Sequence, residues 1–131
     1  MHSNRIRVSK DATHRLKMLK GRTGLTPNLL CRIAFCHSLN DPRPPNPAEY
    51  DSEGLEFNRF TLTGEWDALF MALLKERCIR DGIDYHDPEA FHKTFTAHLN
   101  RGVVAVFNKA RNLQELYSLI PQMSNEPGVK A

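Results

Sequence analysis

Apolar residues recur every three or four positions along most of the chain, which is the spacing of one face of an α-helix. Together with flanking glycine, proline and capping residues, this pattern predicts helices over residues 10–20, 26–39, 63–81, 87–107 and 112–120. A glycine inside the fourth segment is expected to end or kink that helix. We expect the 63–81 helix to be the most buried, because its apolar residues cover more than one narrow stripe.

Two shorter segments depart from the helical pattern. Near the start of the chain Arg5 and Arg7 alternate with Ile6 and Val8, and a period of two indicates a short strand with a basic face. Residues 55–62 indicate a second extended piece. We therefore predict a mainly α fold, a compact helical domain of about four to five helices with a short N-terminal strand. Its start is similar to that of ribbon-helix-helix proteins.

Residues 40–54 interrupt the helical pattern with four prolines, which exclude a regular helix or a central strand. A loop of this length suggests mobility or a role in contacts, and a plain spacer between two helical pairs is an equally good interpretation. The chain of 131 residues corresponds to one domain. We expect a single helical domain over residues 1–121 and a polar tail over residues 122–131.

Composition excludes several classes of protein. Hydrophobic residues make up 40% and charged residues 25% of the chain, which is ordinary for a globular domain. The longest apolar run, residues 68–74, is too short to span a membrane, and the polar start predicts no secretory signal. Cys31, Cys36 and Cys78 are an odd number of cysteines, and they indicate buried thiols in a reducing cytoplasm rather than a disulfide framework.

The charge is unevenly distributed along the chain. Residues 1–37 hold eight arginines and lysines against one aspartate, whereas residues 38–131 hold more acidic than basic side chains. A basic third beside an acidic remainder predicts an anionic partner for one face, and nucleic acid is the commonest such partner. The alternative is a basic surface that serves only to keep the protein solvated.

Six basic side chains of this region are candidate phosphate ligands. Lys10, Lys17 and Lys20 are separated by seven and three positions, so they share a helix face. Arg22 follows in the turn that precedes the next helix start, where backbone amides also attract phosphate. Phosphate contacts carry no sequence information, so we expect weak sequence preference. The candidate DNA-binding residues are Lys17, Lys20, Arg22, Lys10, Arg5 and Arg7.

Catalytic and metal-binding motifs are not evident in the sequence. No histidine pair has metal-ligand spacing, and the chain has no nucleophile elbow and no nucleotide-binding glycine loop. We therefore expect no catalytic residue, no metal and no cofactor. One exception is kept as an alternative: Asp81, Asp84 and Asp87 form an acidic cluster that could hold a divalent cation and assist cleavage of a DNA strand.

Two stretches of the chain resemble a known family. Residues 16–28 (LKMLKGRTGLTPN) and residues 57–65 (FNRFTLTGE) are similar to characteristic segments of the DndE family of DNA sulfur modification proteins. This resemblance implies a small helical homotetramer that acts in bacterial DNA phosphorothioation beside a cysteine desulfurase, a sulfur-transferring iron–sulfur protein and an ATPase. It further implies binding of nicked double-stranded DNA through surface lysines, at positions that match Lys17, Lys20 and Arg22.

The leading hypothesis is a DNA-binding subunit without catalytic activity, which supports sulfur incorporation by its partner proteins. Three alternatives stay open. The first is a strand-nicking endonuclease that uses the acidic cluster, and the second is a ribbon-helix-helix-like repressor that reads bases with Arg5 and Arg7. The third is an adaptor that contacts the ATPase through the proline-rich loop and the acidic remainder of the chain.

Overall fold

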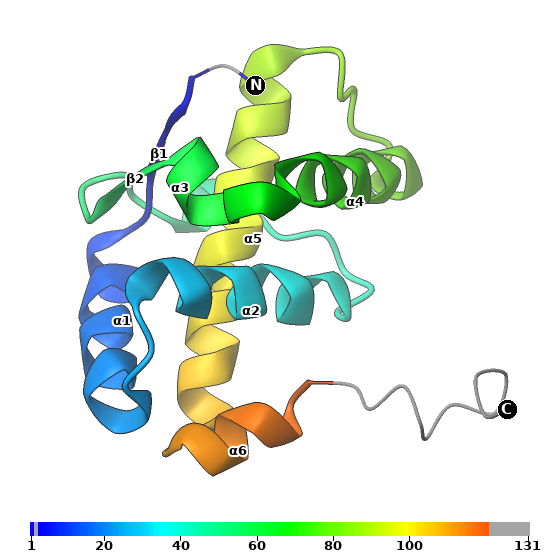
Figure 1. Cartoon of the computed structure of the whole chain (residues 1–131). Coiled ribbons are helices and arrows are strands. Elements are labelled where there is room, and N and C mark those ends of the chain that lie inside the picture. Colours follow the sequence, from blue (N-terminus) through cyan, green and yellow to red (C-terminus); the bar gives the residue numbers. More distant parts are fainter. Residues whose placement is uncertain (2, 121–131) are drawn as a thin grey trace, which may run out of the picture.

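The structure is a computed structural model that describes residue 1 and residues 3–120 (Figure 1). The tail predicted over residues 122–131 lies outside the described residues. The elements are β1 (Arg5–Arg7), α1 (Lys10–Thr23), α2 (Pro27–Leu39), η1 (Pro47–Glu49), β2 (Glu56–Asn58), α3 (Arg59–Thr63), η2 (Gly64–Trp66), α4 (Asp67–Asp81), α5 (Pro88–Lys109) and α6 (Leu113–Ser118), where η marks a 3-10 helix. The predicted mainly α class is confirmed.

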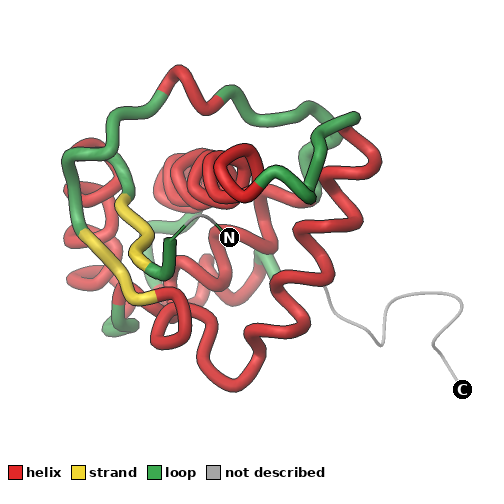
Figure 2. The backbone as a smooth tube through the Cα atoms, turned by 90° about the horizontal axis from the view of Figure 1, so that it is seen from above, coloured by secondary structure: helices red, strands yellow, loops and turns green. Residues whose placement is uncertain are grey.

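Helix α5 runs through the middle of the molecule, and the other elements are arranged around it (Figures 1 and 2). Phe91, Phe95, Leu99 and Val103 follow one another at four-residue intervals, and all four are buried. The expectation that the 63–81 segment would be the most buried helix is therefore wrong. Helix α4 packs at one side of the molecule, and its Leu69 remains 52% exposed.

Helices α2 and α5 cross at close range. Gly102 lies in the middle of α5, and a Cβ atom there would overlap the backbone carbonyl oxygen of Ala34 on α2. The ring of Phe35 packs next to this contact, with its centroid 5.3 Å from that of Phe95 and 5.5 Å from that of Phe70. Gly102 therefore permits a close backbone approach, and α5 continues past it, contrary to the predicted break.

The first strand pairs within its own chain. β1 is antiparallel to β2, with Ile6 opposite Phe57, and both of these side chains are buried in the core. Ribbon-helix-helix repressors instead pair this strand with its copy across a dimer to form a ribbon in the major groove. The pairing of β1 with β2 therefore differs from the arrangement that the repressor alternative requires.

Two helix boundaries differ from the sequence prediction because of local capping. Gly21 stays inside α1, which ends at Gly24, where a φ of 78° favours glycine. In the second case, the Asn58 side chain accepts hydrogen bonds from the backbone amides of Phe60 and Thr61, and it caps α3 five residues before the predicted cap, Thr63. Thr63 ends that short helix, and α4 begins only at Asp67.

The proline-rich segment is tied to the helical core by two arginines. Arg77 on α4 is 1% exposed and donates hydrogen bonds to the carbonyl oxygens of Leu39, Asp41 and Arg43. Arg101 on α5 donates to the same segment at the Arg43 carbonyl. These bonds satisfy backbone carbonyls of a segment that has no regular partner of its own. The first part of the loop is therefore anchored to α4 and α5.

Candidate nucleic-acid interface

Helix α1 sorts its residues into a buried face and a basic face. The hydroxyl of Ser9 caps the helix by accepting a hydrogen bond from the Ala12 amide at 3.0 Å. Leu16 and Leu19 are each 1% exposed and face the core. The lysines of the helix lie on the opposite side and are exposed, as the spacing predicted.

The three lysines of this face differ in their electrostatic surroundings. Lys10 forms an ion pair with Glu53 at 3.3 Å, and both side chains are largely exposed, so this pair contributes at most about 1 kcal/mol and is screened by salt. Lys17 and Lys20 form no ion pair with any carboxylate in the described part of the chain. Their charges are therefore available to an external anion.

Arg22 takes a different position from the lysines. It lies in the last turn of α1, and its guanidinium stacks over the ring of Phe107 on α5 at 4.4 Å. Arg15 stacks over the same ring at 4.8 Å and also pairs with Asp11 at 2.8 Å. A stacked guanidinium still presents N–H donors at its own edge, so Arg22 is held in place while these groups can reach a phosphate.

The two arginines of β1 are exposed on the same face of the strand, as the alternation predicted. Arg7 is engaged by Glu56 at 2.9 Å and by the carbonyl oxygen of Gly54 at 3.1 Å. The side chain of Arg5 has no ion pair with the described residues. Arg5 is thus a second candidate for an external anion, whereas Arg7 is partly neutralised.

The three acidic residues of the predicted cluster each have a structural partner. Asp81 pairs with the buried Arg77 at 2.8 Å, Asp84 accepts a hydrogen bond from the His86 amide, and Asp87 caps α5. Within the described ranges no three histidine, cysteine or acidic residues converge in a way that would hold a metal ion. These structural contacts do not support the metal site on which the strand-nicking alternative depends, and that alternative is left to the plasmid-nicking activity of the pure protein.

The three cysteines are free thiols with different exposure. Cys31 and Cys78 are buried, as predicted, but Cys36 is exposed on α2, so that prediction is wrong for one of the three. Burial raises the pKa of the Cys31 thiol to about 12, and partial burial also raises the pKa of Cys36. At neutral pH the thiols are protonated, and none of them is activated as a nucleophile.

A cavity near β1 was not predicted from the sequence. It has a volume of about 610 Å³ and is lined by residues of three distant segments, within residues 5–7, 46–52 and 89–100. Each segment contributes only a few lining residues, and no sequence motif connects the three, so the sequence gives no signal for the cavity. Among the lining residues, only Arg5 and Arg7 belong to the DNA-binding residues predicted from the sequence.

The fold and the surface define a small, mainly α protein with an exposed basic helix face. No helix in the described part of the chain combines the length and the apolarity that a membrane crossing requires.

The chain belongs to the DndE family: the model described as DNA sulphur modification protein DndE matches residues 5–114. It is similar to the crystal structure of DndE from Escherichia coli B7A, described as involved in DNA phosphorothioation modification. The identity is 30%, the TM-score is 0.66, and 81% of this chain and 98% of that chain are covered. A glycine-to-lysine mutant of DndE gives 27% identity and a TM-score of 0.63, covering 80% and 98% of the two chains. No curated protein sequence gives a significant match.

Proposed function

We propose that this protein is the DNA-binding subunit of a bacterial phosphorothioation system and that it binds nicked double-stranded DNA through the basic face of α1. The observation that supports this most directly is the exposure of Lys17 and Lys20 on one helix face without carboxylate partners. Membership of a DNA sulfur modification family makes DNA the natural anionic ligand. We assign this binding to a single domain that spans residues 1–121.

The proposed contact is made with phosphates. Lys17 and Lys20 are one helical turn apart, about 4.5 Å along the axis, so both can reach one stretch of a single DNA backbone. Arg22, on another side of the same helix end, offers a planar donor fork to a further phosphate. Such contacts depend on salt and are largely independent of sequence. A nick makes the duplex easier to bend, which lets its backbone follow a curved protein surface.

We further propose that the chain forms a homotetramer that works with the sulfur-transfer protein and the ATPase of the system. Phe60, Trp66 and Leu69 lie close together in sequence and are each at least 50% exposed, which favours burial against another protein surface. Sedimentation at micromolar concentration is expected to give four times the chain mass of 15.0 kDa. Trp66→Ser is expected to shift this species toward smaller assemblies, and a monomeric wild-type protein would contradict the assembly.

A DNA titration tests the function itself. Intact, nicked and single-stranded DNA of the same sequence are compared at two salt concentrations. We expect Lys17→Glu with Lys20→Glu to weaken binding of nicked duplex by at least about tenfold, because two phosphate contacts become repulsive. The matched control reverses two exposed charges on α4, Lys75→Glu with Arg80→Glu, and is expected to bind nearly as tightly as the wild type.

The outcome of this titration separates the remaining alternatives. Equal loss of binding in both double variants would show that only net charge matters and that the α1 face is not the interface. Unchanged binding in the α1 variant would place the interface elsewhere. A repressor would require strong preference for one operator sequence, whereas we expect similar affinity for unrelated sequences that carry the same nick.

A further inference from the structure

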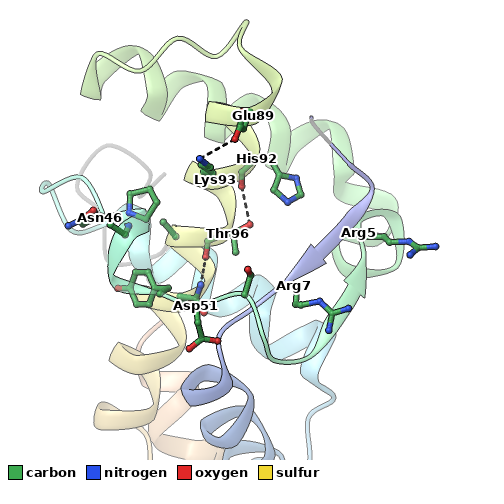
Figure 3. A pocket seen from close by; sticks show the side chains of 14 residues that line it. Arg5, Arg7, Asn46, Asp51, Glu89, His92, Lys93 and Thr96 are labelled. Atoms are coloured by element: carbon green, nitrogen blue, oxygen red, sulfur yellow. Dashed lines mark hydrogen bonds and ion pairs between the residues drawn. The ribbon is translucent and has the colours of Figure 1, made fainter.

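The cavity between β1, the η1 loop and α5 has the size of a small-ligand site. Its volume of about 610 Å³ lies within the range of pockets that enclose small organic molecules. Figure 3 shows Glu89, His92, Lys93 and Thr96 following one another along α5, with Asn46 on the opposite loop. Strand β1 forms the third side of the cavity through Arg5 and Arg7.

The acidic side chains of this cavity already have partners. Asp51 accepts hydrogen bonds from the backbone amides of Lys10 and Glu53, each at 3.0 Å. Glu89 pairs with Lys93 at 3.1 Å. These contacts reduce the repulsion that the two carboxylates would exert on an anion.

Arg5 is the cation at the rim of the cavity that can accept an anion. Figure 3 shows the side chains of Arg5 and Arg7 projecting from β1 on the outer side. Arg7 is held by Glu56 and by the carbonyl oxygen of Gly54, whereas the exposed side chain of Arg5 makes no hydrogen bond or ion pair with the described residues. A flexible arginine can turn toward a phosphate at the cavity mouth and bind it bidentately.

The loop side of the cavity offers groups suited to a nucleobase. Tyr50 lines the cavity and is half-buried, so its ring presents a partly enclosed aromatic surface. Aromatic rings stack on bases of any sequence. Asn46 and Thr96 lie on opposite walls (Figure 3). The Thr96 hydroxyl donates to the His92 carbonyl and the side-chain carbonyl oxygen of Asn46 accepts from the Ala48 amide, which leaves the Thr96 oxygen as an acceptor and the Asn46 amide group as a donor for a base edge.

We propose that this cavity binds one nucleotide, with the phosphate at Arg5 and the base stacked on Tyr50. Two sources share this chemistry: a free nucleoside monophosphate, and the terminal nucleotide of a nicked strand. The second source, the terminal nucleotide of a nicked strand, rests on the function proposed above. It agrees with the position of the cavity, because Asp51 at its edge holds the first amide of α1, at Lys10. The N-terminal end of α1, the helix that carries Lys17 and Lys20, therefore adjoins the cavity.

The nucleotide site is tested without duplex DNA. Deoxyadenosine monophosphate is titrated into the isotope-labelled full chain, and amide shifts are followed by NMR. We expect saturable shifts at cavity residues, weakened about tenfold by Arg5→Ala through loss of one charge-assisted contact, and weakened also by Tyr50→Leu. Lys17→Glu with Lys20→Glu should leave this binding unchanged. Thermal melting verifies that each variant is folded.

Comparison ligands make the result decisive. Deoxyadenosine and inorganic phosphate, each alone, are expected to bind more weakly than the monophosphate. The proposal is overturned if the monophosphate causes no cavity shifts at millimolar concentration, or if inorganic phosphate reproduces the same shifts with the same affinity.

The source of the nucleotide follows from the duplex titration. If Arg5→Ala abolishes the preference for nicked over intact duplex, the terminal nucleotide occupies the cavity. If Arg5→Ala weakens monophosphate binding but leaves the preference for nicked duplex unchanged, the cavity binds a free nucleotide. The proposal that the terminal nucleotide of a nicked strand occupies it is then wrong. If the monophosphate binds while no duplex binds to the wild type, the nucleotide site stands and the proposed DNA-binding function fails.

Discussion

His98 illustrates how a single polar side chain is placed in the core of this protein. It is fully buried, and its Nδ1 atom lies 2.8 Å from the hydroxyl of Ser38. That hydroxyl oxygen also accepts a hydrogen bond from Nε of Arg101, which places the positive charge of the guanidinium close to the imidazole. Burial, together with the charges of Arg101 and Arg77, lowers the pKa of His98 to about 3.

This arrangement predicts a specific pH dependence of stability. A histidine in the unfolded chain has a pKa near 6.5, so between about pH 6.5 and 3 the unfolded state binds one more proton at His98 than the folded state. The free energy of unfolding therefore falls as the pH is lowered through this window, by about 1.4 kcal/mol per pH unit. Urea unfolding at pH 7 and pH 5 is expected to show a loss of about 2 kcal/mol more in the wild type than in His98→Gln.

The comparison with His98→Gln isolates this residue. The pKa of His37 is also lowered, by burial first and then by Lys109, but the wild type and the variant share that group. Equal losses of stability in the two proteins would show that His98 is not the titrating group.

The contact between α2 and α5 depends on a glycine whose role is steric. Gly102 lets the backbone of α5 approach the carbonyl of Ala34, whereas Gly21 in α1 has open space where a Cβ would be placed. Both glycines are inside helices, and glycine is a poor helix former. The two positions therefore separate the effect of packing from that of helix propensity.

Alanine at these positions is expected to have opposite effects. Gly102→Ala should destabilise the protein by about 1–3 kcal/mol, because the backbone of α2 cannot move aside without disturbing the core. Gly21→Ala should stabilise it by about 0.5–1 kcal/mol through higher helix propensity. Thermal unfolding followed by circular dichroism measures both. A rise in Tm for Gly102→Ala would contradict the close helix crossing.

At the scale of the whole molecule, ion pairs with later parts of the chain neutralise some of the basic side chains of the first third and leave others without a carboxylate partner. Glu53 and Glu56 partly neutralise Lys10 and Arg7, so the cations without carboxylate partners in α1 are those toward its C-terminal end. Lys17 and Lys20, with Arg22 at the end of the helix, are therefore the phosphate-binding residues that we propose. This set is narrower than the six basic residues that charge and spacing indicated.

The salt dependence of DNA binding is expected to reflect this set. Each phosphate contact contributes about −0.9 to the slope of log K against log salt concentration for duplex DNA. Lys17→Gln with Lys20→Gln should therefore reduce the slope by about 1.8, whereas Lys75→Gln with Arg80→Gln should leave it nearly unchanged. Fluorescence anisotropy over a series of salt concentrations measures the slopes. A similar reduction for both pairs would indicate diffuse attraction instead of local contacts.

Much of this architecture is readable from local patterns in the chain. Ser9, Thr26 and Asp87 cap α1, α2 and α5 as their positions before apolar repeats predicted, because a cap and its helix are adjacent in sequence. The exposure of Lys17 and Lys20 followed from the same periodicity. Residues 16–28 and 57–65 also carried the resemblance to the family that the comparisons confirm.

Other features depend on residues that are far apart in sequence and meet only in the folded chain. The pairing of β1 with β2, the burial of Arg77 beneath the proline-rich loop, and the cavity beside Tyr50 all require such encounters. Hydrophobic periodicity shows which side of a helix is buried, but it does not specify what covers that side. For this reason the sequence determined the helices and their exposed charges, whereas tertiary contacts decided the rest. The pairing of β1 with β2 and the segment before β2 determined which charges are neutralised, and the packing of α5 beside the loop and β1 determined where a ligand can enter.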